Sequence, residues 1–145
     1  MFPLALTCLS LAAPDAPAAK IDREALKRFE GSWKLTAQEH GGKKSDKKEI
    51  VRVTLDVKGA KWTTRDGVEV KEEAAVEALD AKARPATIDL RITSGSDADK
   101  TVRGIWKRDG DTLTICVAEP NRERPKEFAG QEGSGHTLLV FTRSK

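Results

Sequence analysis

Apolar and polar residues alternate along most of this chain, in eight short segments separated by turn residues. Alternation with a period of two predicts antiparallel β-strands, each with one buried face and one wet face. Consecutive strands leave two open edges unless the first and last strands pair, so closure into a barrel is favoured. The sequence therefore predicts an all-β fold, an eight-stranded antiparallel up-and-down barrel, with strands at residues 32–40, 50–57, 61–64, 68–79, 86–93, 101–108, 111–117 and 136–142.

The fourth segment, residues 68–79, has a pattern that fits two structures. Its second half, from Glu72 to Leu79, is rich in good helix formers and could form a helix. We favour a strand because hairpin connections flank the segment on both sides. The first of these connections contains Asp66-Gly67, a pair that tolerates a positive φ and is typical of tight hairpin turns.

A short helix is predicted before the first strand, over residues 21–30. The apolar residues that fall on one side of it at helical spacing are Ile21, Ala25, Leu26 and Phe29. Acidic residues occupy its first turn and basic residues its last, an arrangement that the helix dipole favours. Gly31 then allows a sharp turn into the first strand.

The first 19 residues differ from the rest of the chain, with no basic residue and one acid. Their apolar run, from Pro3 to Ala13, is too short to cross a bilayer, which takes about 20 residues. Small residues at 16–19 suit a signal peptidase. We therefore expect residues 1–19 to be a signal peptide and residues 20–145 to be one exported domain, periplasmic or extracellular, without an integral membrane segment. Two other interpretations are a disordered leader on a cytosolic protein and a lipoprotein attached at Cys8.

Charged residues make up 34% of the chain, and the formal net charge is +3. Both signs are mixed throughout, whereas nucleic-acid binding usually requires a clustered basic face. The densest basic run, residues 43–48, is interpreted as a solvated loop. The sequence therefore predicts no nucleic-acid partner, and we expect the mature domain to be a monomer.

Six short motifs occur in the order and spacing of a known family. They are residues 29–34 (FEGSWK), 85–90 (PATIDL), 104–106 (GIW), 109–116 (DGDTLTIC), 123–128 (ERPKEF) and 133–138 (GSGHTL). With these motifs the chain resembles, from Leu26 to Arg143, the uncharacterised lipocalin-like domain known mainly from planctomycete bacteria. The resemblance implies a calycin-like barrel in a small exported protein without an assigned activity.

The Gly-x-Trp motif at Gly31 and Trp33 also resembles that of lipocalins in general. In those proteins the tryptophan packs across the closed end of the barrel, beneath an arginine of the last strand. The resemblance therefore implies structural roles for Gly31, Trp33 and Arg143. An arginine over an indole ring stabilises a fold by about 0.5–2 kcal/mol. The Thr-Asp-Tyr motif of lipocalins is absent, since the chain has no tyrosine.

The barrel interior is the first candidate site. The residues predicted to line it are Trp33, Leu35, Val53, Leu55, Trp62, Leu90, Trp106 and Ile115. An eight-stranded barrel can be filled by such side chains or can hold one small ligand, and both interpretations remain open. We expect a small apolar ligand to contact Trp62 and Trp106, at the mouth opposite Trp33. Glu72 also falls in the inward register, where a carboxylate needs a partner.

The segment before the last strand, residues 119–135, is the second candidate site. Loops of this length are uncommon in compact domains and often carry function. Arg124 and Phe128 lie in one of the family motifs, so they are candidate ligand-binding residues together with Trp62 and Trp106. One interpretation is a lid or a contact surface, in a protein-interaction or cell-envelope structural module. The other is a proline-stiffened crossover in which Phe128 plugs the barrel mouth.

Catalysis would require a constellation of reactive side chains. The candidates are His40, His136 and Cys116, which show no metal-ligand spacing. Cys116 alternates with inward residues, so we expect its thiol outside the barrel interior, buried under the helix or the long loop. The sequence therefore predicts no catalytic residue, no metal and no cofactor, and hence a non-enzymatic domain whose candidate partner is a small apolar ligand.

Overall fold

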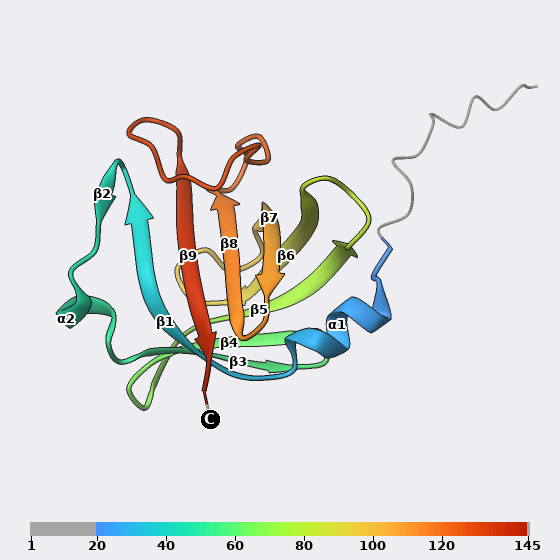
Figure 1. Cartoon of the computed structure of the whole chain (residues 1–145), viewed down its shortest axis with the longest axis horizontal. Coiled ribbons are helices and arrows are strands. Elements are labelled where there is room, and N and C mark those ends of the chain that lie inside the picture. Colours follow the sequence, from blue (N-terminus) through green and yellow to red (C-terminus); the bar gives the residue numbers. More distant parts are fainter. Residues whose placement is uncertain (1–19, 145) are drawn as a thin grey trace, which may run out of the picture.

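The computed structural model describes residues 20–144, and the predicted signal peptide, residues 1–19, lies outside them. Two helices and nine strands make up the described part of the chain (Figure 1). The helices are α1 (Arg23–Phe29) and α2 (Lys47–Ile50). The strands are β1 (Gly31–His40), β2 (Lys43–Lys44), β3 (Val53–Lys58), β4 (Lys61–Asp66), β5 (Glu69–Asp80), β6 (Ala86–Ser94), β7 (Thr101–Asp109), β8 (Thr112–Ala118) and β9 (His136–Arg143).

Eight of the strands form a closed antiparallel barrel, which confirms the predicted fold class. Apart from β2, each strand pairs with the next along the chain, and β1 pairs with β9 to close the sheet. The pairs Trp33–Arg143 and His40–Thr137 mark the two ends of this closing seam. The two-residue β2 pairs only with the far end of β1, so it extends the barrel without belonging to its wall.

The segment that fits both a strand and a helix is a strand, β5, with 12 residues. Its neighbours β4 and β6 pair with it on both sides, so its backbone groups find partners in the sheet. Register shifts interrupt both pairings and let the long strand follow the curvature of the barrel. Tertiary pairing therefore overrides the helix propensity of residues 72–79.

The predicted strand at residues 50–57 is wrong at its start. Ile50 is the last residue of α2, where its side chain is buried, and β3 begins only at Val53. Val51 is about half exposed, because the chain turns between the helix and the strand. The basic run at residues 43–48, expected to be a solvated loop, is divided between β2 and α2, and its lysines are exposed.

A β-bulge in β1 changes which side chains point inward. Leu35 pairs with Phe141 but Ala37 pairs with Val140, so Thr36 is an extra residue in the strand. The prediction that Ala37 shares the inner face is therefore wrong, and this residue is exposed. Each later residue of β1 likewise lies on the face opposite to the one predicted, because side chains alternate along a strand.

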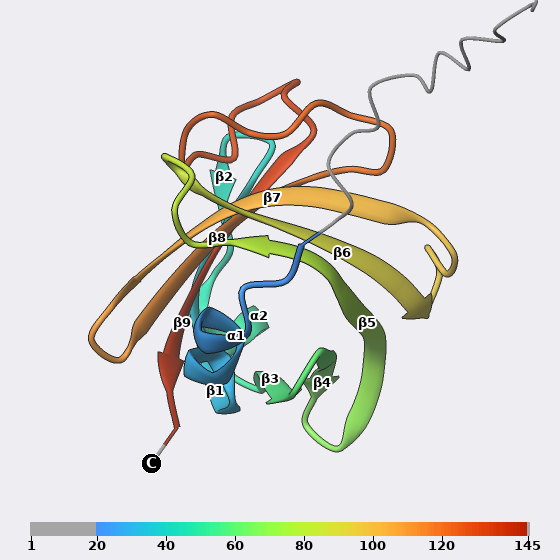
Figure 2. The same ribbon diagram turned by 90° about the vertical axis from the view of Figure 1, so that its right-hand side faces the viewer.

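The helix α1 lies across one end of the barrel (Figure 2). Asp22 caps it, accepting a hydrogen bond from the Ala25 amide at 3.1 Å. The helix buries Ala25 and Phe29 against the core. It begins two residues later than predicted, since Ile21 instead forms a bridge with Leu79 near the end of β5.

Trp33 and Arg143 meet at this end of the barrel, beside α1. Trp33 is fully buried, and its indole N–H donates to the carbonyl of the last residue of α1 at 2.8 Å. The Arg143 guanidinium carbon lies 4.3 Å from the Trp33 ring centroid, and the guanidinium donates to the Arg28 and Glu30 carbonyls. A Cβ at Gly31, where φ is +123°, would lie 2.9 Å from Arg143 Nη1. Glycine thus gives the arginine room to reach these carbonyls.

Candidate functional site

Aromatic side chains fill the α1 end of the barrel interior. Phe29 projects from α1, and its ring centroid lies 4.8 Å from that of Trp106 and 5.6 Å from that of Trp62. Trp33 belongs to the same buried cluster. Aromatic pairs of this kind contribute about 0.5–1.5 kcal/mol each beyond the burial of their surfaces. This end of the interior is therefore packed.

Trp62 and Trp106 lie at this packed end, and not at the opposite mouth where we expected them. Trp62 is the second residue of β4, directly after the turn at residues 59–60. Trp106 pairs with Ala86, the first residue of β6, next to the turn at residues 81–85. Both turns lie at the α1 end, so the side chains beside them do too.

A small cavity remains between Trp62 and the opposite mouth, with a volume of about 90 Å³. Its apolar walls include Leu90, Val102, Val117 and Leu139. A water molecule takes up about 30 Å³ in the liquid, so the cavity has room for about three waters. Side chains therefore fill most of the barrel interior, and the remaining space fits only a small chemical group.

Trp62 forms one wall of this cavity and has an unused hydrogen-bond donor. It is 5% exposed, and its indole N–H has no hydrogen-bond partner among the described residues. The indoles of Trp33 and Trp106 both donate to backbone carbonyls, that of Trp106 to Thr87 at 3.0 Å. An unpaired buried donor costs about 1–3 kcal/mol. The N–H itself has no accessible surface, so a molecule in the cavity would contact the ring of Trp62 and not this donor.

Glu72 lines the same cavity from β5, in the inward register that the sequence predicts. It pairs with Thr64, which lies two residues beyond Trp62 on β4, so Glu72 is nearer the mouth. Burial raises the pKa of its carboxyl group, and the negative charge of Asp97 raises this pKa further. Glu72 takes part in no ion pair within the described part of the chain.

Replacing Glu72 with glutamine is expected to raise the melting temperature at neutral pH and to leave it unchanged at about pH 3. A carboxyl group whose pKa rises on folding destabilises the folded state once the pH exceeds the ordinary value of 4.5. Below that value the group is protonated in both states, so the penalty disappears. Thermal unfolding of the wild type and of Glu72→Gln at the two pH values measures the difference.

Glu73→Gln is the matched control for this experiment. Glu73 is the next residue on β5, faces the other side of the sheet and pairs with Lys61 at 3.7 Å. We expect no gain in melting temperature from this control at neutral pH. Equal gains in the two variants, or a loss in Glu72→Gln, would contradict a burial penalty at Glu72.

Arg124 lies on the outer wall of the barrel, where it ties residues 119–135 to β6 and β7. Its guanidinium donates to the Ile88 carbonyl at 3.1 Å and to the Gly104 carbonyl at 2.8 Å. It also donates to Asp89 Oδ1 at 2.6 Å, in an ion pair whose side chains are 30% and 24% exposed. Arg124 therefore anchors the long loop and does not reach the interior cavity.

Phe128 also lies on the outer wall, and it does not plug the barrel mouth. Its ring centroid lies 4.6 Å from Lys107 Nζ, on β7. Together with Trp106 and residues 81–86, Phe128 lines a hollow of about 630 Å³ on the outer surface. Phe128 and Trp106 thus line the same hollow. Of the four residues predicted to bind a ligand, Trp62 alone lines the interior cavity.

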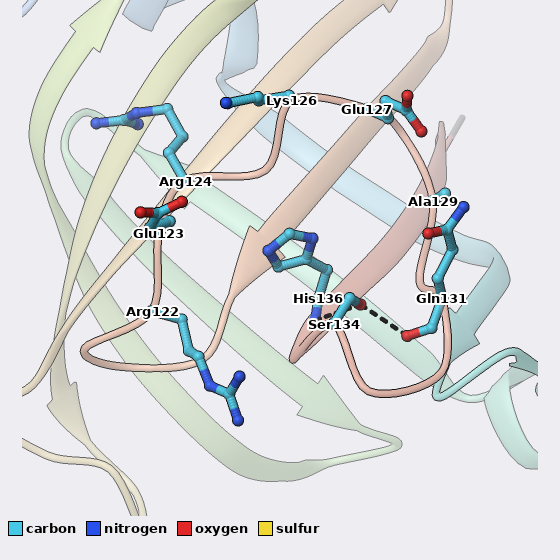
Figure 3. A pocket seen from close by; sticks show the side chains of 9 residues that line it. All are labelled: Arg122, Glu123, Arg124, Lys126, Glu127, Ala129, Gln131, Ser134 and His136. Atoms are coloured by element: carbon cyan, nitrogen blue, oxygen red, sulfur yellow. Dashed lines mark hydrogen bonds between the residues drawn. The ribbon is translucent and has the colours of Figure 1, made fainter.

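Residues 119–135 enclose a further hollow of about 530 Å³ (Figure 3). Charged side chains of both signs surround it, among them Arg122, Lys126 and Glu127. The loop is tied to β1 here, because the Gly130 amide donates to a Glu39 carboxylate oxygen at 3.1 Å. The mixture of charges around this open hollow favours no particular class of ligand.

Cys116 is buried beneath the same loop, as predicted, and its thiol donates to the Ala129 carbonyl at 3.5 Å. Burial raises the pKa of this thiol, which disfavours the reactive thiolate. His40 pairs with Thr137 across the seam, so the neighbouring His136 points to the opposite face of the sheet. Among the described residues, no group of three or more His, Cys, Asp or Glu side chains could hold a metal ion.

Sequence reasoning missed Thr64 and Leu139 as cavity residues. The signal that could have found them is the alternation itself. Thr64 lies two residues after Trp62, and Leu139 two residues before the buried Phe141, so each shares an inward face with a core residue.

No protein-family model matches this chain, and no curated protein matches it either. No helix between residues 20 and 144 combines the length and the apolar composition that a membrane span requires. The fold is a β-barrel compatible with the lipocalin-like calycins. Any statement about function therefore depends on the residues of the barrel and its cavity.

Proposed function

We propose that this protein is a non-enzymatic, lipocalin-like barrel that binds the short apolar end of a small molecule beside Trp62. The observation that carries the proposal is the interior cavity, which Trp62 lines together with apolar side chains of the strands. Polar groups at the other end of the cavity, Thr64 and Glu72, suit a ligand that is amphipathic.

The proposal includes membership of the planctomycete lipocalin-like family and export from the cell. The packing of Arg143 over Trp33 supports a calycin-like closure of the barrel. The composition of residues 1–19 supports a signal peptide. The alternative, a protein-interaction or envelope module that uses residues 119–135, has less support, because Arg124 and Phe128 both contact the barrel wall.

The size of the cavity limits what can enter it. An apolar protein cavity of about 150 Å³ binds one benzene molecule, which has six non-hydrogen atoms. In proportion, a cavity of about 90 Å³ accommodates about four such atoms. A branched group of four carbon atoms therefore fits, and any larger part of the ligand must lie at the mouth.

Isobutanol is a suitable probe, because its four carbon atoms match the cavity. In a proton–nitrogen NMR titration we expect the Trp62 indole signal to shift as isobutanol packs against the Trp62 ring. The indole signals of Trp33 and Trp106 should stay in place, because neither residue lines the cavity. The variant Trp62→Phe assigns the signal.

A pair of variants on β9 controls for binding elsewhere. Leu139 lines the cavity, so Leu139→Phe should fill the space and abolish the shift. Leu138 is the next residue and pairs with Cys116 on the outer face, so Leu138→Phe should leave the shift unchanged. The proposal is wrong if the Trp62 signal of the folded wild type does not move at the solubility limit of isobutanol.

A further inference from the structure

The mouth of the interior cavity carries a negative charge that no basic side chain of the described residues neutralises. Glu72 lines the cavity and forms no ion pair. The lysines of β4 and β5 have other partners. Lys61 pairs with Glu73 at 3.7 Å, and Lys71 pairs with Glu69 at 3.3 Å.

The loop between β6 and β7 brings a second acid to this mouth. Gly95 of that loop packs against β5, and a Cβ there would lie 3.6 Å from Glu72 Cγ. Asp97 follows two residues later, and its negative charge acts on the Glu72 carboxyl group. The ion pair of Asp97 with Lys100 is on the surface, where water weakens such pairs. The Glu72 carboxyl group therefore has an acidic neighbour at the mouth.

Trp62 and Glu72 mark the two ends of the cavity. Thr64 lies two residues beyond Trp62, which is about 7 Å along a strand, and Thr64 pairs with Glu72. An apolar group that fills the cavity beside Trp62 therefore places its attached polar group at the level of Glu72. The chemistry of that polar group follows from the charge that it meets there.

We propose that the ligand of this barrel carries a positively charged amine, which binds Glu72 at the mouth while its apolar part fills the cavity. This inference rests on the proposed function and adds the chemical class of the ligand. An ammonium group donates charge-assisted hydrogen bonds to the carboxylate and supplies the partner that a half-buried charge requires. The chain as a whole has a net charge of +3, so the attraction for cations is local to this mouth.

Isobutylamine and isobutanol test the inference, because they share one carbon skeleton and differ in the charge of the polar group. Both are titrated into the wild-type protein at neutral pH, with the Trp62 indole signal as the readout. We expect the amine to bind at least about tenfold more tightly, a difference that a charge-assisted hydrogen bond readily supplies. Added salt should reduce this preference.

Two variants assign the preference to Glu72. Glu72→Gln keeps the shape of the side chain and should make the two affinities equal, whereas Glu73→Gln, on the other face of β5, should leave the preference unchanged. If isobutanol binds and the amine binds no better, or if Glu72→Gln keeps the preference, the inference is overturned while the proposed function stands. If isobutanol does not shift the Trp62 signal, the proposed function is overturned, and the inference that rests on it is overturned as well.

Discussion

Replacing Trp33 with alanine is expected to destabilise the barrel by about 3–5 kcal/mol, the usual cost of removing a large aromatic side chain from a core. Trp33 is fully buried, and its indole N–H donates to the Phe29 carbonyl. The substitution also removes the ring over which Arg143 lies. Denaturant unfolding of the wild type and the variant measures the difference in the free energy of unfolding.

Trp33→Phe separates the contribution of the ring from that of the N–H group. It keeps an aromatic side chain but leaves the Phe29 carbonyl without its side-chain donor, so we expect a smaller loss, about 1–2 kcal/mol. If Trp33→Ala cost less than about 1 kcal/mol, Trp33 would not be the packing centre that its burial indicates.

Replacing Arg124 with alanine is expected to cost about 2–3 kcal/mol and to release residues 119–135 from the barrel wall. The guanidinium makes three hydrogen bonds there, one of them to Asp89, and bonds with a charged partner contribute about 1.5–3 kcal/mol. Denaturant unfolding gives the loss of stability. Hydrogen exchange should show faster exchange of the Gly130 amide, which the loop holds against Glu39.

Arg122→Ala is the matched control, since the same loop carries both arginines. Its side chain is 55% exposed, and its ion pair with Glu119 spans 4.0 Å, so its removal should change stability by less than about 0.5 kcal/mol. Equal losses from the two substitutions would show that charge alone, and not the anchoring of Arg124, stabilises the loop.

The barrel itself could be predicted because most of its strands keep one phase of alternation from turn to turn. The predicted strand at residues 86–93 and the observed β6 differ by one residue at the end. The bulge at Thr36 could not be predicted, since an inserted residue reverses the phase without changing the local composition. The helix α2 was missed for a similar reason, because Ile50 fits both a strand and one short helical turn.

The candidate site was harder to predict, because alternation gives the face of a side chain but not its height in the barrel. Trp62 and Trp106 face inward as predicted, yet both lie at the α1 end, since each is close to a turn at that end. Residues 119–135 have no periodic pattern at all. Their sequence therefore carried no sign that Arg124 reaches the carbonyls of β6 and β7.

The seam between β1 and β9 determines how the molecule responds to tension. The two strands run antiparallel. The first residue of β1, Gly31, and the last residue of β9, Arg143, therefore lie together beside α1. A force that separates these ends loads one hydrogen-bonded pair after another, from Trp33–Arg143 toward His40–Thr137. The pairs between β1 and β3 break in the same order, starting at Gly31, because that pairing also begins there. Under such a force the strand pairs therefore break one after another. The force needed is that for one residue pair at a time and does not depend on the total free energy of unfolding.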